Sequence, residues 1–353
     1  MASTATLSSL ASDRPQDRAI AVWLLVCCAM IFAMAVIGAI TRLTESGLSI
    51  MEWAPLSGAL PPLSEAEWQR LFALYKTIPE YQQINRGMSL AEFKEIFWWE
   101  YIHRLWGRLI GLVFALPFLW FLLTGRVRRG LAPHLVAMLA LGGLQGLLGW
   151  YMVASGFAER TDVSQYRLVA HLGLAAAIYA YVLWIALGLL TANGDAGPRS
   201  LQKALIAFAV LLAITIATGG LVAGLNAGLI YNSFPLMDGE LVPAGYGQLD
   251  PWLLNLFENV AAVQFNHRVL AVMTVLAAFA LWLWALRFPL TAPQSSAMTA
   301  MALMAALQLA LGIATLLLVV PVWLGALHQA GAFLLLSLTI WVLRSLRPMQ
   351  SPP

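Results

Sequence analysis

Long uninterrupted stretches of apolar residues, separated by short polar or basic segments, run along most of the chain. A helix needs about 20 apolar residues to cross a ~30 Å hydrocarbon core. The stretches that reach this length predict eight membrane-spanning helices, at roughly 19–40, 102–124, 132–154, 168–191, 204–225, 259–285, 296–319 and 324–343. The pattern therefore predicts an all-α integral membrane protein.

Basic residues gather on one side of these predicted spans. They are Arg14, Arg18, Arg126, Arg128, Arg129, Arg199, Lys203, Arg287, Arg344 and Arg347. The short loops on the opposite side hold Arg160 and little else. Because short loops rich in lysine and arginine stay in the cytoplasm, we expect both termini there and the long loop 41–99 outside. With no signal cleavage site or long arginine-rich transit sequence, the expected location is the bacterial inner membrane.

The two halves of the chain repeat one another. His103-Arg104 recurs as His267-Arg268, and Leu144-Gln145-x-x-Leu148-Gly149 recurs as Leu307-Gln308-x-x-Leu311-Gly312. Each copy holds four predicted helices, so both copies have the same orientation in the membrane. We expect two four-helix bundles related by a pseudo-twofold axis along the membrane normal. The predicted order is cytoplasmic tail, bundle, cytoplasmic linker, bundle and cytoplasmic tail, at 1–18, 19–191, 192–203, 204–343 and 344–353.

The long loop 41–99 is predicted to contain helices. Ser64-x-x-Glu67 and Ser89-x-x-Glu92 have the form of capping boxes. Between them, four large side chains share one helical face: Trp68, Leu71, Phe72 and Tyr75. The second box is expected to start a helix that continues into the second span. The first helix would then be either a lid near the outer rim or a surface helix resting on lipid.

Composition agrees with a membrane location and excludes several chemistries. Of the 353 residues, 61% are hydrophobic and only 10% are charged, far below the ~25% charged residues of soluble domains. The net charge of +3 gives no indication of a nucleic-acid partner. Cys27 and Cys28 are adjacent in the first span, and neither CxxCH nor a zinc-binding spacing occurs.

Four of the five histidines occupy matching places in the repeat. His103 and His171 lie near the outer ends of the second and fourth predicted helices, and His267 and His328 near those of the sixth and eighth. Ionisable groups inside a membrane are costly, so they indicate function. Neutral imidazole is a good iron ligand. One imidazole per helix, on alternate helices at one depth, is what two bis-histidine haem sites require.

Charged residues beside these histidines favour the same interpretation. Guanidiniums at the outer helix ends are suited to bind haem propionates, and the candidates are Arg104, Arg108, Arg167 and Arg268. Snorkelling to the membrane surface is the alternative role for each arginine.

Glu100 shares a helix face with His103, three residues away. A buried carboxylate beside a haem can carry protons, which Gln264 at the matching position of the second half cannot. This difference predicts that the first half is catalytic and that the second only holds haem. An ion pair with Arg104 is the structural alternative for Glu100.

Two other functions use the same residues differently. A non-catalytic haem b electron carrier would need the four histidines but would give Glu100 no task. Because both predicted haems lie near one surface, electron transfer across the membrane is disfavoured. A transporter with parallel repeats would place its site near the midplane, whereas these histidines lie at the outer rim.

At these residues the chain resembles the haem A synthase family, over essentially its whole length. The resemblance is carried by Glu100-x-x-His103-Arg104, the His171 helix, Asn266-His267-Arg268, the His328 helix and segment 226–239. Some bacterial members carry a cysteine pair in the outer loops, which this sequence lacks. It is therefore more similar to the proteobacterial and mitochondrial branch.

The resemblance implies an oxidoreductase that converts the C8 methyl group of haem O to a formyl group by successive hydroxylations, giving haem A for terminal oxidases. By analogy, His267 and His328 would ligate a resident haem b. His103 and His171 would flank the substrate haem, with Glu100 beside the reacting methyl group. The implied partners are a haem O synthase and an electron acceptor whose identity stays open.

Overall fold

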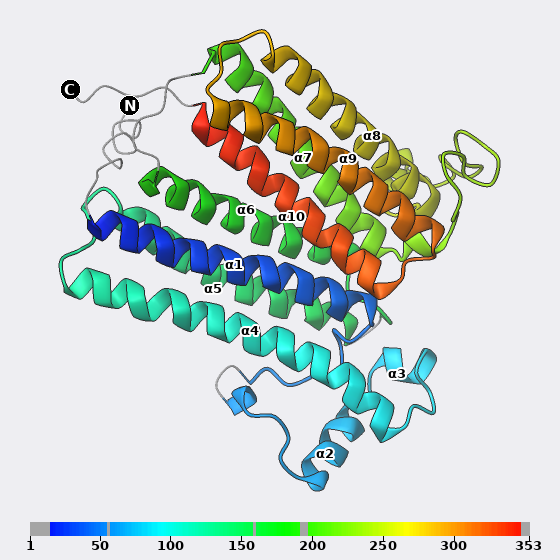
Figure 1. The fold of residues 1–353 in the computed structure, drawn as a ribbon. Coiled ribbons are helices and arrows are strands. Elements are labelled where there is room, and N and C mark those ends of the chain that lie inside the picture. The colour runs from blue at the N-terminus through cyan, green and yellow to red at the C-terminus, as the bar shows by residue number, and fades with distance from the viewer. Residues whose placement is uncertain (1–14, 55–56, 158–159, 191–196, 347–353) are drawn as a thin grey trace.

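The computed structural model describes residues 15–54, 57–157, 160–190 and 197–346, and the remaining parts of the predicted tails and linker lie outside the described residues. Within these ranges, eight helices are long and apolar enough to span a membrane. They are α1 (Pro15–Leu43), α4 (Leu90–Leu123), α5 (Ala132–Val153), α6 (Gln165–Leu190), α7 (Arg199–Gly224), α8 (Val260–Ala285), α9 (Ala292–Leu317) and α10 (Val322–Ser345). All eight predicted spans are thus confirmed (Figure 1).

The eight helices contact one another in two rings of four. In the first ring α1 contacts α4, α4 contacts α5, α5 contacts α6 and α6 returns to α1; in the second, α7 to α10 close in the same way. The rings meet through α6 and α7 and through α1 and α10 (Figure 1). Arg42 ties them together, because its guanidinium donates to the Ala223 carbonyl and to Asn226 Oδ1, both at 2.9 Å.

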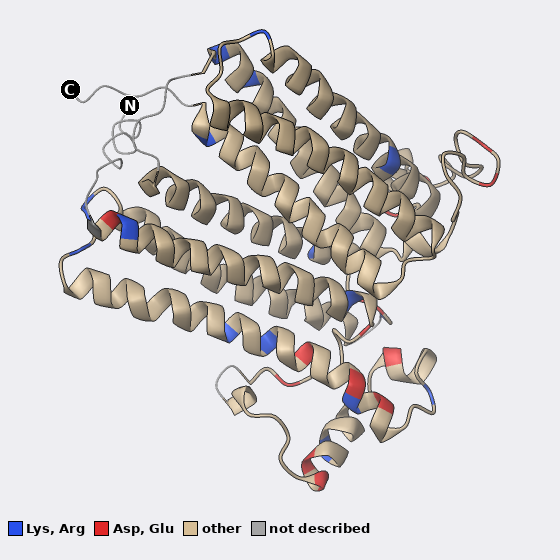
Figure 2. Cartoon of the chain, in the orientation of Figure 1, with Lys and Arg blue, Asp and Glu red and all other residues tan. Residues whose placement is uncertain are grey.

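Charge divides the two ends of the helices. Figure 2 shows lysines and arginines at both ends of the helices, whereas acidic residues gather at the loops of one end, the loop end. Basic residues prevail at the other end, where α1 begins and α10 ends, which we call the basic end. Asp17 is an acidic residue at the basic end, where it pairs with Arg128 at 3.1 Å. The basic end carries the short basic loops from which the sequence predicts a cytoplasmic face, and that orientation stays a prediction.

Tight apolar packing occupies the basic half of the bundles. The largest cluster of buried side chains draws on all eight spanning helices. On α4 it begins at Phe114 and on α8 at Ala278, so His103 and His267 lie outside it, further toward the loop end. The helices are therefore held together at one end, and the candidate ligands lie at the other.

A small helical cap covers part of the loop end. It contains α2 (Glu65–Tyr75), α3 (Pro79–Gln83), the short η2 turn (Ser57–Ala59) and the first turns of α4. Ser89 and Glu92 form the predicted capping box, and α4 continues without a break into the membrane span. At the other predicted box, Ser64 accepts from the Glu67 N–H, but the Glu67 carboxylate binds Arg70 instead, at 2.7 Å.

The apolar face of α2 packs on α4. Trp68 lies edge-on against Phe97, with ring centroids 4.8 Å apart, and Phe72 stacks on Phe93 at 5.0 Å. Tyr75 and Phe93 are fully buried. The apolar face is therefore covered by protein, and a role of α2 as a lid stays a prediction.

The loop end of the second ring is formed by the segment from 225 to 259. It contains two short turns, η4 (Ala227–Leu229) and η5 (Trp252–Leu256), and no longer helix. A further turn, η3 (Ala154–Gly156), ends α5 in the first ring.

Candidate functional site

Each of the four predicted ligands lies against a glycine on the preceding membrane-spanning helix. His103 on α4 faces Gly38 on α1, and the other pairs are His171 with Gly149, His267 with Gly219, and His328 with Gly312. A Cβ added at the glycine would stand 3.4, 3.0, 3.1 and 2.8 Å, respectively, from the nearest ring atom. Three of the four imidazoles therefore occupy space that any other residue would fill.

The four imidazoles form two pairs. His103 and His171 are near enough to interact electrostatically, and so are His267 and His328. All four residues are half-buried, so part of each surface stays accessible to another molecule. The structure thus brings together one predicted pair in each ring of helices.

Three of the imidazoles have a side-chain partner at Nδ1. Thr218 Oγ1 lies 3.1 Å from His267 Nδ1, Gln145 Nε2 lies 3.2 Å from His171 Nδ1, and Gln308 Nε2 lies 3.1 Å from His328 Nδ1. Both glutamines also donate to the backbone carbonyl of their histidine. Among the described residues, the His103 ring has no such partner.

These surroundings fit a haem held by two imidazoles. The glycines let the imidazole rings lie close against the neighbouring helix, and all four histidines are only half-buried. The Oε1 atoms of Gln145 and Gln308 are buried without a hydrogen-bond partner. An iron-ligating histidine usually donates its other N–H to a nearby acceptor, and for His267 the Thr218 hydroxyl is placed to accept it.

Glu100 is fixed on both carboxylate oxygens. Oε2 accepts from Ser49 Oγ and from the Ile50 N–H, each at 2.7 Å, while Oε1 accepts from Arg104 at 2.6 and 3.0 Å. The carboxylate is 2% exposed. The ion pair that the sequence left open as the structural alternative is therefore present, and it ties the first turns of the 41–99 loop to α4.

Gln264 has the complementary set of contacts. Its Nε2 donates to the Ala227 and Ile230 carbonyls, and its Oε1 accepts from Arg268 at 2.9 Å. The loop of the first ring of helices offers hydrogen-bond donors to Glu100, and the loop of the second ring offers carbonyl acceptors to Gln264. A carboxylate in the first ring and an amide in the second therefore match the backbone groups around them.

The four predicted propionate-binding arginines have different surroundings. Arg104 also donates to the Ile50 and Glu52 carbonyls, and Arg268 donates to those of Tyr231 and Ser233. Arg167 lies over the Tyr151 ring, 3.7 Å from its centroid, donates to the Tyr151 carbonyl at 2.6 Å and is half-buried. Arg104 and Arg268 therefore hold loops, whereas Arg167, one turn from His171 on α6, binds the end of α5.

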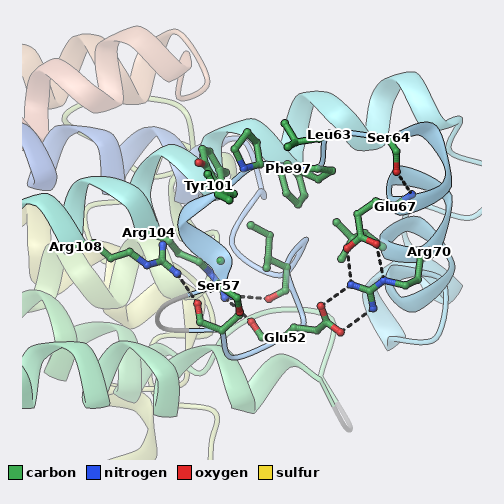
Figure 3. Close-up of a pocket in the computed structure, with 17 residues that line it drawn as sticks. Glu52, Ser57, Leu63, Ser64, Glu67, Arg70, Phe97, Tyr101, Arg104 and Arg108 are labelled. Atoms are coloured by element: carbon green, nitrogen blue, oxygen red, sulfur yellow. Dashed lines mark hydrogen bonds and ion pairs between the residues drawn. The ribbon is translucent and has the colours of Figure 1, made fainter.

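Arg108 lines a pocket of about 420 Å³ between α4 and the cap (Figure 3). Its guanidinium donates to the Ala54 carbonyl at 2.9 Å. Arg104 and Tyr101 share this side of α4, and the Glu52 and Glu67 carboxylates close the far end around Arg70. Figure 3 shows both α4 arginines pointing toward this pocket.

The sequence did not assign a role to the glutamines, the glycines or Thr218. Gln145 and Gly149, like Gln308 and Gly312, were visible only as part of a repeated motif. Their four-residue spacing puts both on one helix face, which is the signal that they serve a common neighbour. Thr218 has no repeated counterpart and gave no signal.

Fold and site together define a class: a multi-pass α-helical membrane protein with two internal histidine pairs suited to bind haem. The family model described as a cytochrome oxidase assembly protein, COX15-CtaA, matches residues 21–340. The chain belongs to this family.

Several relatives named haem A synthase are similar to this chain over nearly its whole length. A haem A synthase of Rhodospirillum centenum is 55% identical over 338 residues, covering 95% of this chain and 90% of the relative. One from Nitrosospira multiformis is 50% identical over 335 residues, covering 94% of each chain. A third, from Nitrosomonas eutropha, is 48% identical and covers 93% of each chain. The resemblance predicted from the motifs is confirmed.

Proposed function

We propose that the chain is a haem A synthase, an oxidoreductase that converts the C8 methyl group of haem O to a formyl group by successive hydroxylations. The observation that carries the proposal is the pair of imidazoles in each ring of helices, seated on glycine and placed where the tight apolar core ends. Family membership supports the same activity.

The two histidine pairs have different tasks in this proposal. His267 and His328 would hold a resident haem b, and His103 and His171 would flank the substrate haem. A resident haem would supply electron transfer to the substrate site. Haem O would come from a haem O synthase, and an electron acceptor would complete the oxidation.

Residues of the first ring would position the substrate. Glu100 lies one turn from His103 and is held by Arg104, Ser49 and Ile50. It would present a fixed negative charge beside the reacting methyl group, stabilising positive charge or accepting a proton when one of its contacts opens. Arg108, beside the pocket, and Arg104 are the arginines available to a propionate in this half, and Arg268 in the other.

The proposed location is the bacterial inner membrane with both termini in the cytoplasm. The charge asymmetry of Figure 2 supports this orientation, because the basic end would face the cytoplasm. Both haem sites would then lie near the outer surface, with the cap and the 225–259 segment above them.

The test is co-expression with a haem O synthase, followed by haem extraction and chromatography. We expect haem A from the wild type, none from His103→Ala, and retention of haem b in that variant. His267→Ala should lose the haem b spectrum. Haem b alone in the wild type, with no haem O consumed, would instead identify a non-catalytic electron carrier.

A further inference from the structure

The His267 imidazole is held in one orientation by a threonine. Thr218 Oγ1 donates its own hydrogen to the Thr215 carbonyl at 2.9 Å. The lone pairs of the same oxygen then face His267 Nδ1 at 3.1 Å. Since the threonine proton is used in the bond to Thr215, Nδ1 is the donor to Oγ1, and the Thr215 carbonyl is a second acceptor beside the same imidazole. The arrangement places the proton on Nδ1 and leaves Nε2 free to bind a metal.

The corresponding place in the first ring holds isoleucine. Thr218 precedes Gly219, the glycine under His267, and Ile37 precedes Gly38, the glycine under His103. An isoleucine side chain neither donates nor accepts a hydrogen bond. The His103 ring also presents a different edge, since Nε2 is its atom nearest to Gly38, whereas Cε1 is nearest in the other three pairs.

The second ligands share a partner type but are not held identically. Gln145 Nε2 lies 3.2 Å from His171 Nδ1 and 3.3 Å from its Nε2, whereas Gln308 Nε2 lies 3.1 Å from His328 Nδ1. Among the described residues, only at the first ligands does one ring of helices have a side-chain partner that the other lacks.

We propose that the exchange of Thr218 for Ile37 makes His267 a fixed ligand of the permanently held haem and His103 a readily released ligand of the haem that must enter and leave. This inference rests on the proposed function, since it assigns the first ring to substrate. Second partners of a ligating histidine fix its orientation and raise its basicity, and their loss typically costs 10–100-fold in metal affinity. A substrate site that turns over gains from omitting this partner, whereas a resident site does not.

The first experiment measures haem release from purified protein to an excess of apomyoglobin. We expect Thr218→Val, which keeps the shape but lacks the hydroxyl, to release the resident haem b at least about tenfold faster than the wild type. Its midpoint potential should also rise, because the ligand becomes less basic. Thr218→Ser, which keeps the hydroxyl, should restore both values. Unchanged release and potential in Thr218→Val would overturn the proposal for the second ring.

The reciprocal experiment adds the partner to the first ring. In Ile37→Thr, we expect haem O or haem A bound at the first site to leave roughly tenfold more slowly. The haem b spectrum of the second ring reports that the variant is folded, and Ile37→Ser offers a second hydroxyl if threonine does not fit. Release at the wild-type rate from both variants would overturn the proposal for the first ring.

These outcomes separate this inference from the proposed function. If the wild type makes no haem A, yet Thr218→Val loosens one haem and Ile37→Thr tightens the other, the synthase assignment fails and the ligand asymmetry stands. If haem A forms and neither variant alters release, the synthase assignment stands and the asymmetry fails.

Discussion

The Arg104 guanidinium lies 2.6 Å from the Glu100 carboxylate, one turn away on α4, and both side chains are largely buried. The same guanidinium reaches the Ile50 and Glu52 carbonyls. The pair thus connects the histidine-bearing helix to the loop that follows α1. A proposed catalytic carboxylate and a structural ion pair are here the same two residues, so the roles must be separated by experiment.

Glu100→Gln tests the catalytic role. The amide has the same shape, but it lacks the charge and turns an NH₂ group toward one of the donors that the carboxylate accepts from. We expect haem A formation to fall by about 10²-fold or more, while haem b stays bound because the second ring is unchanged. Haem extraction after co-expression with a haem O synthase measures both.

The matched control is Glu52→Gln, which alters an exposed carboxylate in the same loop that binds Arg70. Its haem A output should match the wild type. Full haem A output from Glu100→Gln would reduce Glu100 to a loop anchor and contradict the catalytic assignment.

Gln264→Glu should damage the second ring. Its amide donates to two backbone carbonyls, and a carboxylate there would face both of them without a proton to share. One carboxylate oxygen would keep the Arg268 contact, but the other would replace two hydrogen bonds by repulsion from the carbonyls. Buried groups left unsatisfied cost about 1–3 kcal/mol, so we expect Tm to fall by several degrees. Thermal unfolding in detergent measures the change. A Tm equal to that of the wild type would show that the 227–230 carbonyls do not depend on this donor.

The spans could be predicted because membranes impose a simple rule. Every helix that crosses the hydrocarbon must be long and apolar, and all eight predicted segments are confirmed. The capping box at Ser89 was predictable for the same kind of reason, since Ser and Glu at that spacing satisfy local backbone groups. The cap's position was not, because it depends on Trp68 and Phe72 finding Phe97 and Phe93 on another helix.

The candidate site was predictable only in its ligands. Histidines in apolar helices stand out, and their pairing follows from the repeat. The arginines were harder, because a guanidinium near the membrane surface has several acceptors in reach. Arg104 and Arg268 contact loop carbonyls whose positions follow from tertiary structure alone. Thr218 gave no signal because one hydroxyl in an apolar helix usually bonds its own backbone.

Gly312→Ala should displace a haem ligand. The added Cβ would stand 2.8 Å from His328 Cε1, closer than side chains pack, so the ring or the helix must shift. We expect the haem b content of purified protein to fall about tenfold. Gly38→Ala is the matched control, because its Cβ would lie 3.4 Å from His103, an ordinary contact. Both are measured from the ratio of haem absorbance to protein, and equal haem contents would contradict the role assigned to these glycines.

Glu80 should make the cap sensitive to pH. This residue of α3 is 3% exposed, and its Oε2 is buried without a hydrogen-bond partner. Burial raises its pKa from 4.5 to about 8, with further increases from the Glu45, Asp162 and Glu100 charges and a smaller opposing effect of Arg42. Because the pKa is higher in the folded state, that state binds the proton more tightly than the unfolded chain does. The contribution of Glu80 to stability is therefore greatest below about pH 4.5, declines up to about pH 8, and is constant above it.

Glu80→Gln, which cannot ionise, should remove this decline. We expect the variant to have a Tm several degrees above the wild type at pH 8 and close to it at pH 5, since the penalty begins when the carboxyl of the unfolded chain ionises above about pH 4.5 and is complete only near pH 8. Glu52→Gln is the control, because Arg70 lowers the pKa of that exposed carboxyl and its removal should not raise Tm at pH 8. Thermal unfolding across this pH range decides the matter: parallel Tm profiles for wild type and Glu80→Gln would mean that Glu80 does not titrate in the folded cap.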